Sequence, residues 1–307
     1  MKLFEKICKM TQTELKVWLN NRYFGKGFEI IYEEGFLHLI PQENAIPICF
    51  IAHMDTVHTE KVKKIVVEKH KEKGTTILSS PQGIGGDDRC GIYMIVKLLD
   101  LGYKPYVIFC EDEERGCIGA NKFCKTKYIN EMDIKFMVEL DRRGGNDAVY
   151  YDLDNREFEE FVTETTGYET NYGSVSDISY LAPEAGVAAV NLSCGYYKEH
   201  TIEHYVIWEE MERTLEATMY LIAAAKVEGT PKFEYKEKKR FGYFGGKYGW
   251  YDDPYDDYYV EYVTITWIED SKLNYEMYDG RSIDECVGKF LVDPPYMRYN
   301  DIIVEES

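Results

Sequence analysis

Apolar positions recur along the chain at helix-like and strand-like spacings, and each spacing predicts the corresponding element. Residues 2–20 carry apolar side chains at helical intervals, which predicts one or two amphipathic helices. Two β-hairpins are predicted from paired strand-like runs around polar, glycine-containing turns: residues 28–32 with 36–40, and residues 64–68 with 75–79.

Between residues 46 and 226, strand-like and helix-like segments alternate. Strands are predicted at residues 46–52, 106–110, 134–140, 148–151 and 187–192. Helices are predicted at residues 91–101 and 116–125, for about ten residues from Asn155, shortly after Asp177, and at residues 208–226. Such alternation is typical of parallel βαβ units, which gather ligands at the carboxyl ends of their strands. We therefore predict an α/β fold with a mostly parallel sheet.

The composition changes after residue 230, where Tyr, Gly, Asp and Lys become crowded. Residues 260–267 alternate like a strand, and residues 301–304 are a candidate last strand. Between them, Ser282-Ile283-Asp284-Glu285 has the pattern of a capping box for a short helix reaching Leu291. We predict a catalytic domain over residues 1–230, a linker over residues 231–259 and a small α/β appendage over residues 260–307.

Composition and charge limit the cellular compartment and the classes of binding partner that we expect. The 307 residues are 45% hydrophobic and carry a net charge of −19, which argues against nucleic acid or anionic membrane as the main partner. We expect a cytoplasmic protein, because neither an export signal nor a membrane-spanning apolar run is evident. The eight cysteines are dispersed without a C-x-x-C pair, so we expect reduced thiols that mostly pack in the core.

Acidic and imidazole residues stand at five positions, most of them at predicted strand ends. They are His53-Met54-Asp55, Gly85–Arg89, Glu111–Glu114, Glu139–Asp141 and His200. So many negative charges repel one another unless a positive group lies among them. In this order, the five positions suggest the shell of a two-metal hydrolase.

Two-metal amide hydrolysis needs a particular set of side chains. Two divalent ions about 3.5–4 Å apart can bind a hydroxide between them and polarise the substrate carbonyl. A free carboxylate must also carry a proton from water to the leaving amine. Asp55 lies two residues after His53, so on a strand both side chains face the same way and Asp55 can orient the imidazole. Glu113 and Glu114 are adjacent, so one can bind metal while the other stays free.

Three motifs resemble the co-catalytic zinc exopeptidases, which include peptidase T, glutamate carboxypeptidase and zinc aminopeptidases. The motifs are Ala52-His53-Met54-Asp55-Thr56-Val57, Gly86-Asp87-Asp88-Arg89-Cys90-Gly91 and residues 112–120, within a resemblance that spans about residues 46 to 225. The resemblance implies a three-layer α/β/α fold and two divalent metals, expected to be Zn²⁺. It implies one metal on His53, Asp87 and Asp141, a second on Asp87, Glu114 and His200, Asp55 as the partner of His53, and Glu113 as the general base.

Some assignments stay open at this stage. Glu139 or Asp147 could replace Asp141, and His204 is the rival of His200, which we prefer because Glu203 follows it at the family's spacing. Asp177 could lie near the pocket rim or cap the helix that follows it. His38, His58 and His70 are expected to be surface or hairpin residues.

The chain also departs from the family. Only about thirty-five residues separate Asp141 from Asp177, too few for the lid domain that peptidase T and the carboxypeptidases insert there. A lid histidine that would support the oxyanion is therefore missing, and Tyr196, Tyr197 or Arg142 are candidates to replace it. Arg115 stands where the family usually has a small or apolar residue, and we expect it to be an exposed arginine beside acids.

The resulting prediction is an aminopeptidase that releases amino-terminal residues from short peptides, by a metal-bound hydroxide with Glu113 as general base. A deacylase of N-acyl amino acids or a carboxypeptidase would use the same site. A non-catalytic binding protein that retains the fold is the alternative from another class, and the intact Glu113 argues against it. Association with further copies of the chain is compatible with the sequence.

Overall fold

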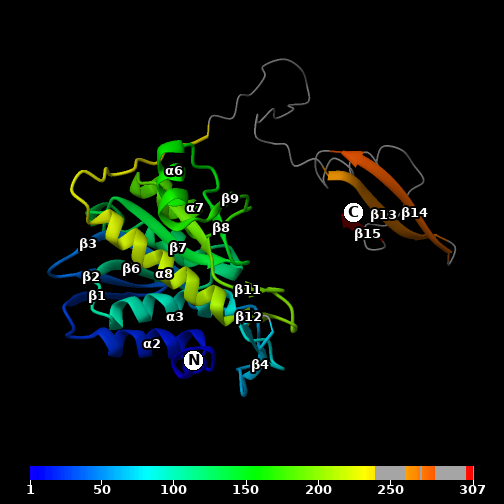
Figure 1. Cartoon of the computed structure of the whole chain (residues 1–307), viewed down its shortest axis with the longest axis horizontal. Coiled ribbons are helices and arrows are strands. Elements are labelled where there is room, and N and C mark those ends of the chain that lie inside the picture. The colour runs from blue at the N-terminus through cyan, green and yellow to red at the C-terminus, as the bar shows by residue number, and fades with distance from the viewer. Residues whose placement is uncertain (73, 239–259, 270–271, 281–301, 307) are drawn as a thin grey trace, which may run out of the picture. The chain divides into compact units, whose positions relative to one another are not determined.

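The computed structural model describes residues 1–72, 74–238, 260–269, 272–280 and 302–306 (Figure 1). The chain forms two compact units, Met1–Lys238 and Lys239–Ser307. All the candidate site residues lie in the first unit.

The elements follow the predicted order. The helices are α1 (Lys2–Cys8), α2 (Gln12–Tyr23), α3 (Gly86–Asp100), α4 (Ile118–Phe123), α5 (Tyr128–Glu131), α6 (Arg156–Thr166), α7 (Ile178–Ala185) and α8 (Trp208–Ala225), with a 3₁₀ turn η1 (Glu113–Arg115). The strands of the first unit are β1 (Phe28–Glu33), β2 (Phe36–Pro41), β3 (Ile46–His53), β4 (Val66–His70), β5 (Thr75–Ser79), β6 (Pro105–Cys110), β7 (Phe136–Arg142), β8 (Asp147–Val149), β9 (Glu169–Asn171), β10 (Ala189–Ser193), β11 (Tyr196–Tyr197) and β12 (Tyr205–Ile207).

The main sheet has eight strands in the order β1-β2-β6-β3-β7-β10-β8-β9. Its centre, β6-β3-β7-β10, is parallel throughout. The predicted hairpin β1-β2 adds two antiparallel strands at one side of this centre, and β8 pairs antiparallel with β10 at the other. The predicted mostly parallel α/β sheet is therefore confirmed, and the carboxyl ends of four strands lie at one edge.

Helices cover both faces of this sheet, which gives the predicted α/β/α layers (Figure 1). Helices α3 and α8 pack on β3, whereas α4 packs on β2 and β6 and α7 on β10. Alternate residues of β3 enter the two cores: Phe50 and Ala52 lie in one hydrophobic cluster, and Cys49 and Ile51 in the other. Burial on both faces explains why the sequence of β3 is continuously apolar.

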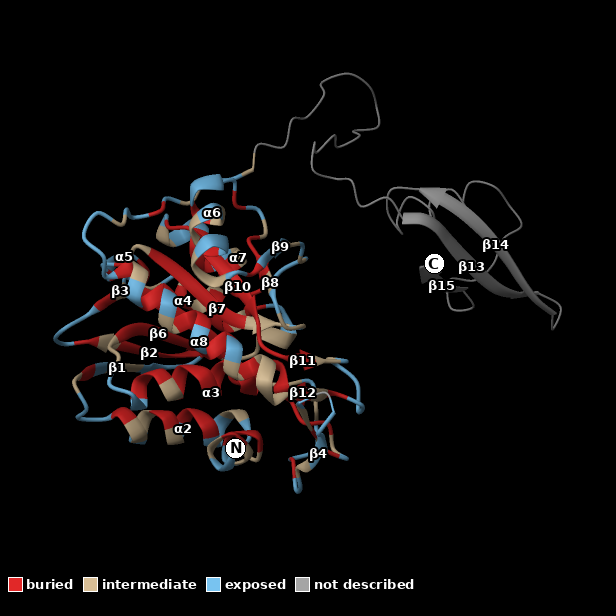
Figure 2. Ribbon diagram, viewed as in Figure 1, coloured by how far each residue is buried: buried red, intermediate tan, exposed pale blue. Residues whose placement is uncertain are grey.

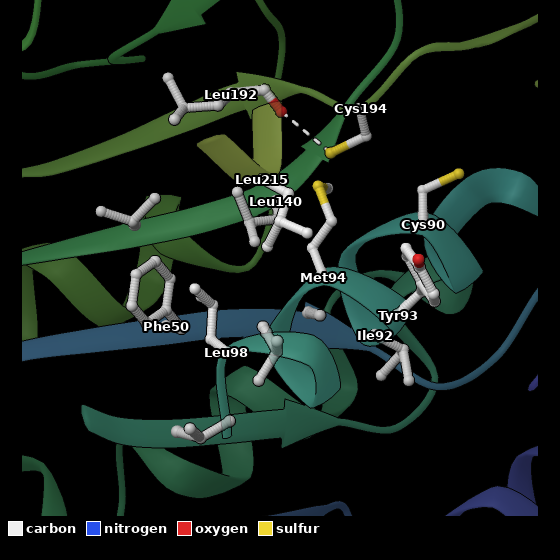
Figure 3. Close-up of a cluster of buried hydrophobic side chains, with 14 of the residues drawn as sticks. Phe50, Cys90, Ile92, Tyr93, Met94, Leu98, Leu140, Leu192, Cys194 and Leu215 are labelled. Atoms are coloured by element: carbon white, nitrogen blue, oxygen red, sulfur yellow. Dashed lines mark hydrogen bonds between the residues drawn. The ribbon is translucent and has the colours of Figure 1, made fainter. Parts of the chain in front are cut away.

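The larger core lies between α3, α8 and the sheet, and buried residues dominate this region (Figure 2). Figure 3 shows Met94 and Leu98 of α3 beside Phe50 of β3 and Leu140 of β7. Helix α3 approaches the sheet closely at Gly91, where an added Cβ would lie 2.1 Å from the Leu140 carbonyl oxygen. Only glycine fits this contact, which brings the start of α3 next to the end of β7.

The second predicted hairpin, β4-β5, belongs to a separate four-stranded sheet in the order β11-β12-β5-β4. The strands β9, β11 and β12 and the helix α5 were not predicted, because two to four residues are too few to display a periodicity. Residues 231–238, which the sequence assigned to the linker, belong to the first unit, where Phe233 is buried.

The second unit contains a three-stranded antiparallel sheet in the order β14-β13-β15. The strands β13 (Val260–Glu269) and β15 (Ile302–Glu306) correspond to predicted strands, and β14 (Lys272–Gly280) was not predicted. The predicted helix at residues 282–291 and linker residues 239–259 lie outside the described residues.

Other sequence expectations can be compared with the described residues. The seven cysteines among them are free thiols, and six of these are buried, as expected for core packing. His38 lies in hairpin strand β2, as one of its two predicted settings, and it is fully buried, so it is not a surface residue. Among the described residues, no helix combines the length and apolar character needed to span a bilayer.

The aromatic cluster around Phe136 yields a stability prediction. Its ring is fully buried, and the ring centroid lies 5.4 Å from that of Phe161 and 5.5 Å from that of Phe158. We expect Phe136→Ala to lower the free energy of unfolding by about 3–5 kcal/mol through lost burial and the cavity left behind. Urea unfolding measures this, and Phe24→Ala is the control, because Phe24 is 77% exposed and should change stability by less than about 0.5 kcal/mol. Equal effects of the two substitutions would contradict this packing.

Candidate metal centre and active site

The predicted site residues come from the carboxyl edge of the sheet and its adjoining loops. They are His53 at the end of β3, Asp141 near the end of β7, Glu113 and Glu114 in η1 after β6, Asp87 at the start of α3, and His200 between β11 and β12. The register of β3 and β6 pairs His53 with Cys110, so His53 lies just before the loop that carries the two glutamates. The fold therefore brings residues far apart in the sequence to one edge.

Asp87 lies at the centre of the site, with one imidazole on each of its carboxylate oxygens. His53 Nε2 is 2.9 Å from Asp87 Oδ1, and His200 Nε2 is 3.4 Å from Asp87 Oδ2. Beyond them, His53 Nε2 lies 3.4 Å from Asp141 Oδ1, and His200 Nε2 lies 3.0 Å from Glu114 Oε2. The predicted ligands thus form two groups that share Asp87.

Two sets of three side chains place their ligand atoms within 4.8 Å of one another: His53 with Asp87 and Glu114, and His53 with Asp88 and Asp141. These nitrogen and oxygen donors are of the kind that Zn²⁺ binds in proteins. Asp88, which the sequence analysis did not assign, accepts hydrogen bonds from the backbone N–H groups of His53 and Gly91. The arrangement suits one or two divalent cations.

Asp55 joins the histidine to the glutamate loop. Its Oδ1 lies 3.2 Å from His53 Nδ1, the nitrogen opposite the one that faces Asp87. The same carboxylate accepts the backbone N–H groups of Glu113 and Glu114, at 3.0 and 3.1 Å. Asp55 therefore holds both the tautomer of His53 and the position of η1.

The carboxylates shift the pKa values of the two histidines upward. Burial lowers the pKa of His53, but Asp141, Asp55 and Asp87 outweigh it and hold that pKa well above its usual value. A hydrogen bond to Asp87 raises the pKa of His200 to about 9. Burial, together with the charge of Asp87, raises the pKa of Glu114 to about 7. In the absence of metal, protonated imidazoles thus supply the positive charge that the carboxylates need.

The carboxyl group of Glu113 interacts with the charges of His53 and Asp87. Burial raises the pKa of its carboxyl group, and the buried thiol of Cys117 lies 3.5 Å from Glu113 Oε1. Asp177 is fully buried, and burial together with the charge of Glu113 raises its pKa to about 7. It occupies the N-cap position of α7 but makes no capping hydrogen bond, so the capping alternative was wrong.

The preferred ligands and their rivals have different neighbours. Asp141 faces His53, whereas Glu139 is buried without a hydrogen-bond partner among the described residues and Asp147 lies beside Arg142. His200 faces Asp87 and Glu114, whereas His204 is 1% exposed and neither ring nitrogen has a hydrogen-bond partner in the described part of the chain.

The candidates for oxyanion support differ in whether their side chains contact a ligand of the centre. The Tyr196 hydroxyl donates to Asp141 Oδ1 at 3.2 Å, so it borders the centre. Tyr197 donates instead to Glu210, and Arg142 faces Asp147 at 3.6 Å. Arg115 has a 72% exposed side chain that lies 3.7 Å from Asp112, as expected for an exposed arginine beside acids.

Sequence reasoning missed the residues that support Asp141. Its backbone N–H donates to the Asn191 side chain at 2.9 Å, and the Ser176 hydroxyl donates to Asp141 Oδ2 at 3.2 Å. Asn191 had a detectable signal, since it is the one amide in the otherwise apolar run of residues 187–192. Ser176 had none, because serine is ordinary in a loop.

The sequence matches no family model and no curated protein. Solved structures do resemble the fold. The aminopeptidase PepT from Bacillus cereus aligns with a TM-score of 0.58 and 14% identity, over 74% of this chain and 98% of that one. A tripeptidase from Staphylococcus aureus gives 0.56 and 12%, over 72% and 96%.

A TET aminopeptidase from a marine sediment Thaumarchaeota archaeon aligns with a TM-score of 0.53 and 13% identity, over 72% of this chain and 96% of that one. At such identities the likeness concerns the fold and not the chemistry. The chain thus shares the mostly parallel α/β fold of these solved peptidases, as the resemblance of its motifs predicted.

Proposed function

We propose that this chain is a metal-dependent aminopeptidase that acts on short peptides. The observation that carries the proposal is the pair of imidazoles on opposite oxygens of Asp87, His53 at 2.9 Å and His200 at 3.4 Å. A carboxylate flanked in this way can bridge two cations. The fold shared with a solved tripeptidase and solved aminopeptidases supports a peptidase among the reactions that such a centre can perform.

The residues present fit two divalent metals. His53, Asp87 and Asp141 would hold one, and Asp87, Glu114 and His200 the other, with Zn²⁺ favoured by the mixture of imidazole and carboxylate donors. When bound, such a pair lowers the pKa of water to about 7 and polarises the substrate carbonyl.

Glu113 is the proposed general base. It adjoins the proposed ligand Glu114 in the sequence and is fixed through its backbone by Asp55. Burial raises the pKa of its carboxyl group, which makes it a stronger base than an exposed glutamate. Its role is to take a proton from water and deliver it to the leaving amine.

The charges around the centre favour an amine as the recognised end of the substrate. Four basic side chains near the ligands in sequence are paired with acids: Arg115 with Asp112, Arg142 with Asp147, Arg143 with Glu199 and Lys198 with Glu203. The acidic surround attracts the α-ammonium group of a peptide, which is the end that an aminopeptidase recognises. This favours the aminopeptidase over the carboxypeptidase and deacylase alternatives.

Blocking the amino group of the substrate tests the proposal. We expect cleavage of alanine p-nitroanilide but not of its N-acetyl derivative, loss of cleavage with a chelator and recovery with Zn²⁺. Release of p-nitroaniline measures the rate. Cleavage of only the blocked substrate would favour the deacylase or carboxypeptidase. No chelator-sensitive cleavage of any substrate, with metal bound, would favour a binding protein.

Adjacent glutamates provide a matched pair of variants. We expect Glu113→Gln to lower kcat at least about a hundredfold while both metals stay bound, because it removes only the proton carrier. Glu114→Gln should lose metal as well as activity, because it removes a ligand. Metal content per chain and kcat separate the two roles. Equal loss of metal in both variants would show that Glu113 is a ligand rather than the base.

Protons should compete with the metal. In the metal-free chain the pKa of His200 is raised to about 9 and that of His53 well above its usual value, so both imidazoles are protonated at neutral pH. Metal binding needs them neutral. We therefore expect Zn²⁺ to displace protons at pH 7 and to bind more tightly as the pH rises towards 9. Calorimetry in two buffers of different ionisation enthalpy counts the protons, and His200→Ala should release fewer. A pH-independent affinity would contradict this.

A further inference from the structure

A cavity of about 200 Å³ borders the proposed centre at Asp55. Three segments form its wall: residues 8–12 between α1 and α2, residues 55–62 after β3, and residues 83–85 with Arg89 at the start of α3. Pockets for drug-sized ligands are typically larger, about 300–1,000 Å³. The size therefore suits one side chain or one terminal group of a small peptide.

Two buried polar atoms of this wall, Arg89 Nε and His58 Nε2, have no hydrogen-bond partner among the described residues. Arg89 is 3% exposed, and its terminal nitrogens donate to the backbone carbonyls of Met54 and Met10. Within the described residues, no carboxylate pairs with its guanidinium within 4.0 Å. The charges of Asp55 and Asp88 act on the guanidinium from a longer distance, but burial outweighs them and lowers the pKa of Arg89. A buried charge that is only partly compensated is costly, so Arg89 favours an anion in the cavity.

The hydroxyl groups of the wall can act as further donors. Thr56 Oγ1 accepts the backbone N–H of His58 at 3.0 Å, and Thr11 Oγ1 accepts that of Glu14 at 3.3 Å. Each hydroxyl keeps its own hydrogen to donate. An occupant with acceptor oxygens would therefore meet donors from all three segments.

The acids of the wall are already engaged or exposed. Asp55 accepts hydrogen bonds from His53 and from the backbone of Glu113 and Glu114. Glu60 has a 69% exposed side chain that lies 3.6 Å from Lys63. Asp55 offsets the charge of the buried guanidinium only in part, because burial still lowers the pKa of Arg89.

We propose that this cavity binds a carboxylate group of the peptide substrate, with Arg89 as its anchor and His58 as a second donor. The inference rests on the proposed function, because the cavity shares Asp55 with the centre that would cleave the peptide. Two parts of a peptide carry this chemistry: an acidic side chain at the first residue, or the terminal carboxylate of a di- or tripeptide.

Two matched substrate pairs distinguish these sources in the metal-loaded enzyme. Glutamyl and glutaminyl p-nitroanilides differ only in the side-chain charge, and Ala-Ala and Ala-Ala-amide differ only at the carboxyl terminus. We expect kcat/KM to favour the charged member of one pair by at least about tenfold, as a hydrogen bond between charged groups allows. Equal rates within both pairs would overturn the proposal.

Variants assign the preference to the cavity. His58→Leu should reduce the preference several-fold, and Arg89→Met should abolish it. Arg89→Lys, which keeps the charge, should retain part of it. A preference unchanged in both His58→Leu and Arg89→Met would overturn the assignment. If Arg89→Met fails to fold, because Arg89 also holds two buried carbonyls, His58→Leu and Arg89→Lys decide.

A binding measurement separates this inference from the proposed function. Glutarate should raise the thermal unfolding temperature of the metal-depleted chain, whereas the neutral analogue glutaramide should not, and the rise should shrink in His58→Leu. No stabilisation by glutarate would overturn the carboxylate site even in an active peptidase. Stabilisation of the metal-depleted chain by glutarate, together with no peptide cleavage by the metal-loaded chain, would support the carboxylate site and overturn the peptidase.

Discussion

The organisation of this protein depends on the mutual repulsion of carboxylates gathered at one edge of its sheet. Asp55, Asp87, Glu114 and Asp141 each lie within 3.4 Å of one of two imidazoles, and their side chains are at most 11% exposed, although His200 is 57% exposed. Among buried side chains, like charges at short range repel far more strongly than in water. Protonated histidines and backbone N–H groups offset that repulsion in the metal-free chain, and divalent cations would offset it more completely. The centre is therefore built around positive charge.

The fold produces this concentration of charge through parallel strands and close packing. Strands β6, β3, β7 and β10 run in one direction, so the loops that follow them meet at one edge. Glycines then bring the next elements close. An added Cβ at Gly119 of α4 would lie 2.4 Å from the Gly35 carbonyl oxygen and 2.6 Å from the Glu111 backbone nitrogen, so only glycine lets α4 begin directly behind η1.

Asp55 links the parts of the proposed mechanism. Its carboxylate holds His53 in one tautomer and fixes the backbone of the two adjacent glutamates, one a proposed ligand and the other the proposed base. The same residue borders the cavity at which Arg89 Nε has no hydrogen-bond partner among the described residues. An amine near the acidic centre and a carboxylate near Arg89 would orient a short peptide by its two opposite charges. Charge complementarity of this kind selects among substrates as well as binding them.

Much of this protein could be predicted from local pattern. The hairpin β1-β2, the apolar strand β3 and the helix α6 after Asn155 all correspond to periodicities or caps contained within about fifteen residues. The order of the candidate ligands could also be predicted, because each follows a predicted strand or a distinctive motif.

Tertiary structure decided the rest. It made His200 rather than His204 face Asp87, buried Asp177, paired Asn191 with Asp141 fifty residues away and enclosed the cavity at Arg89. Burial and hydrogen-bond partners are set by neighbours distant along the chain, and a local pattern carries no record of them.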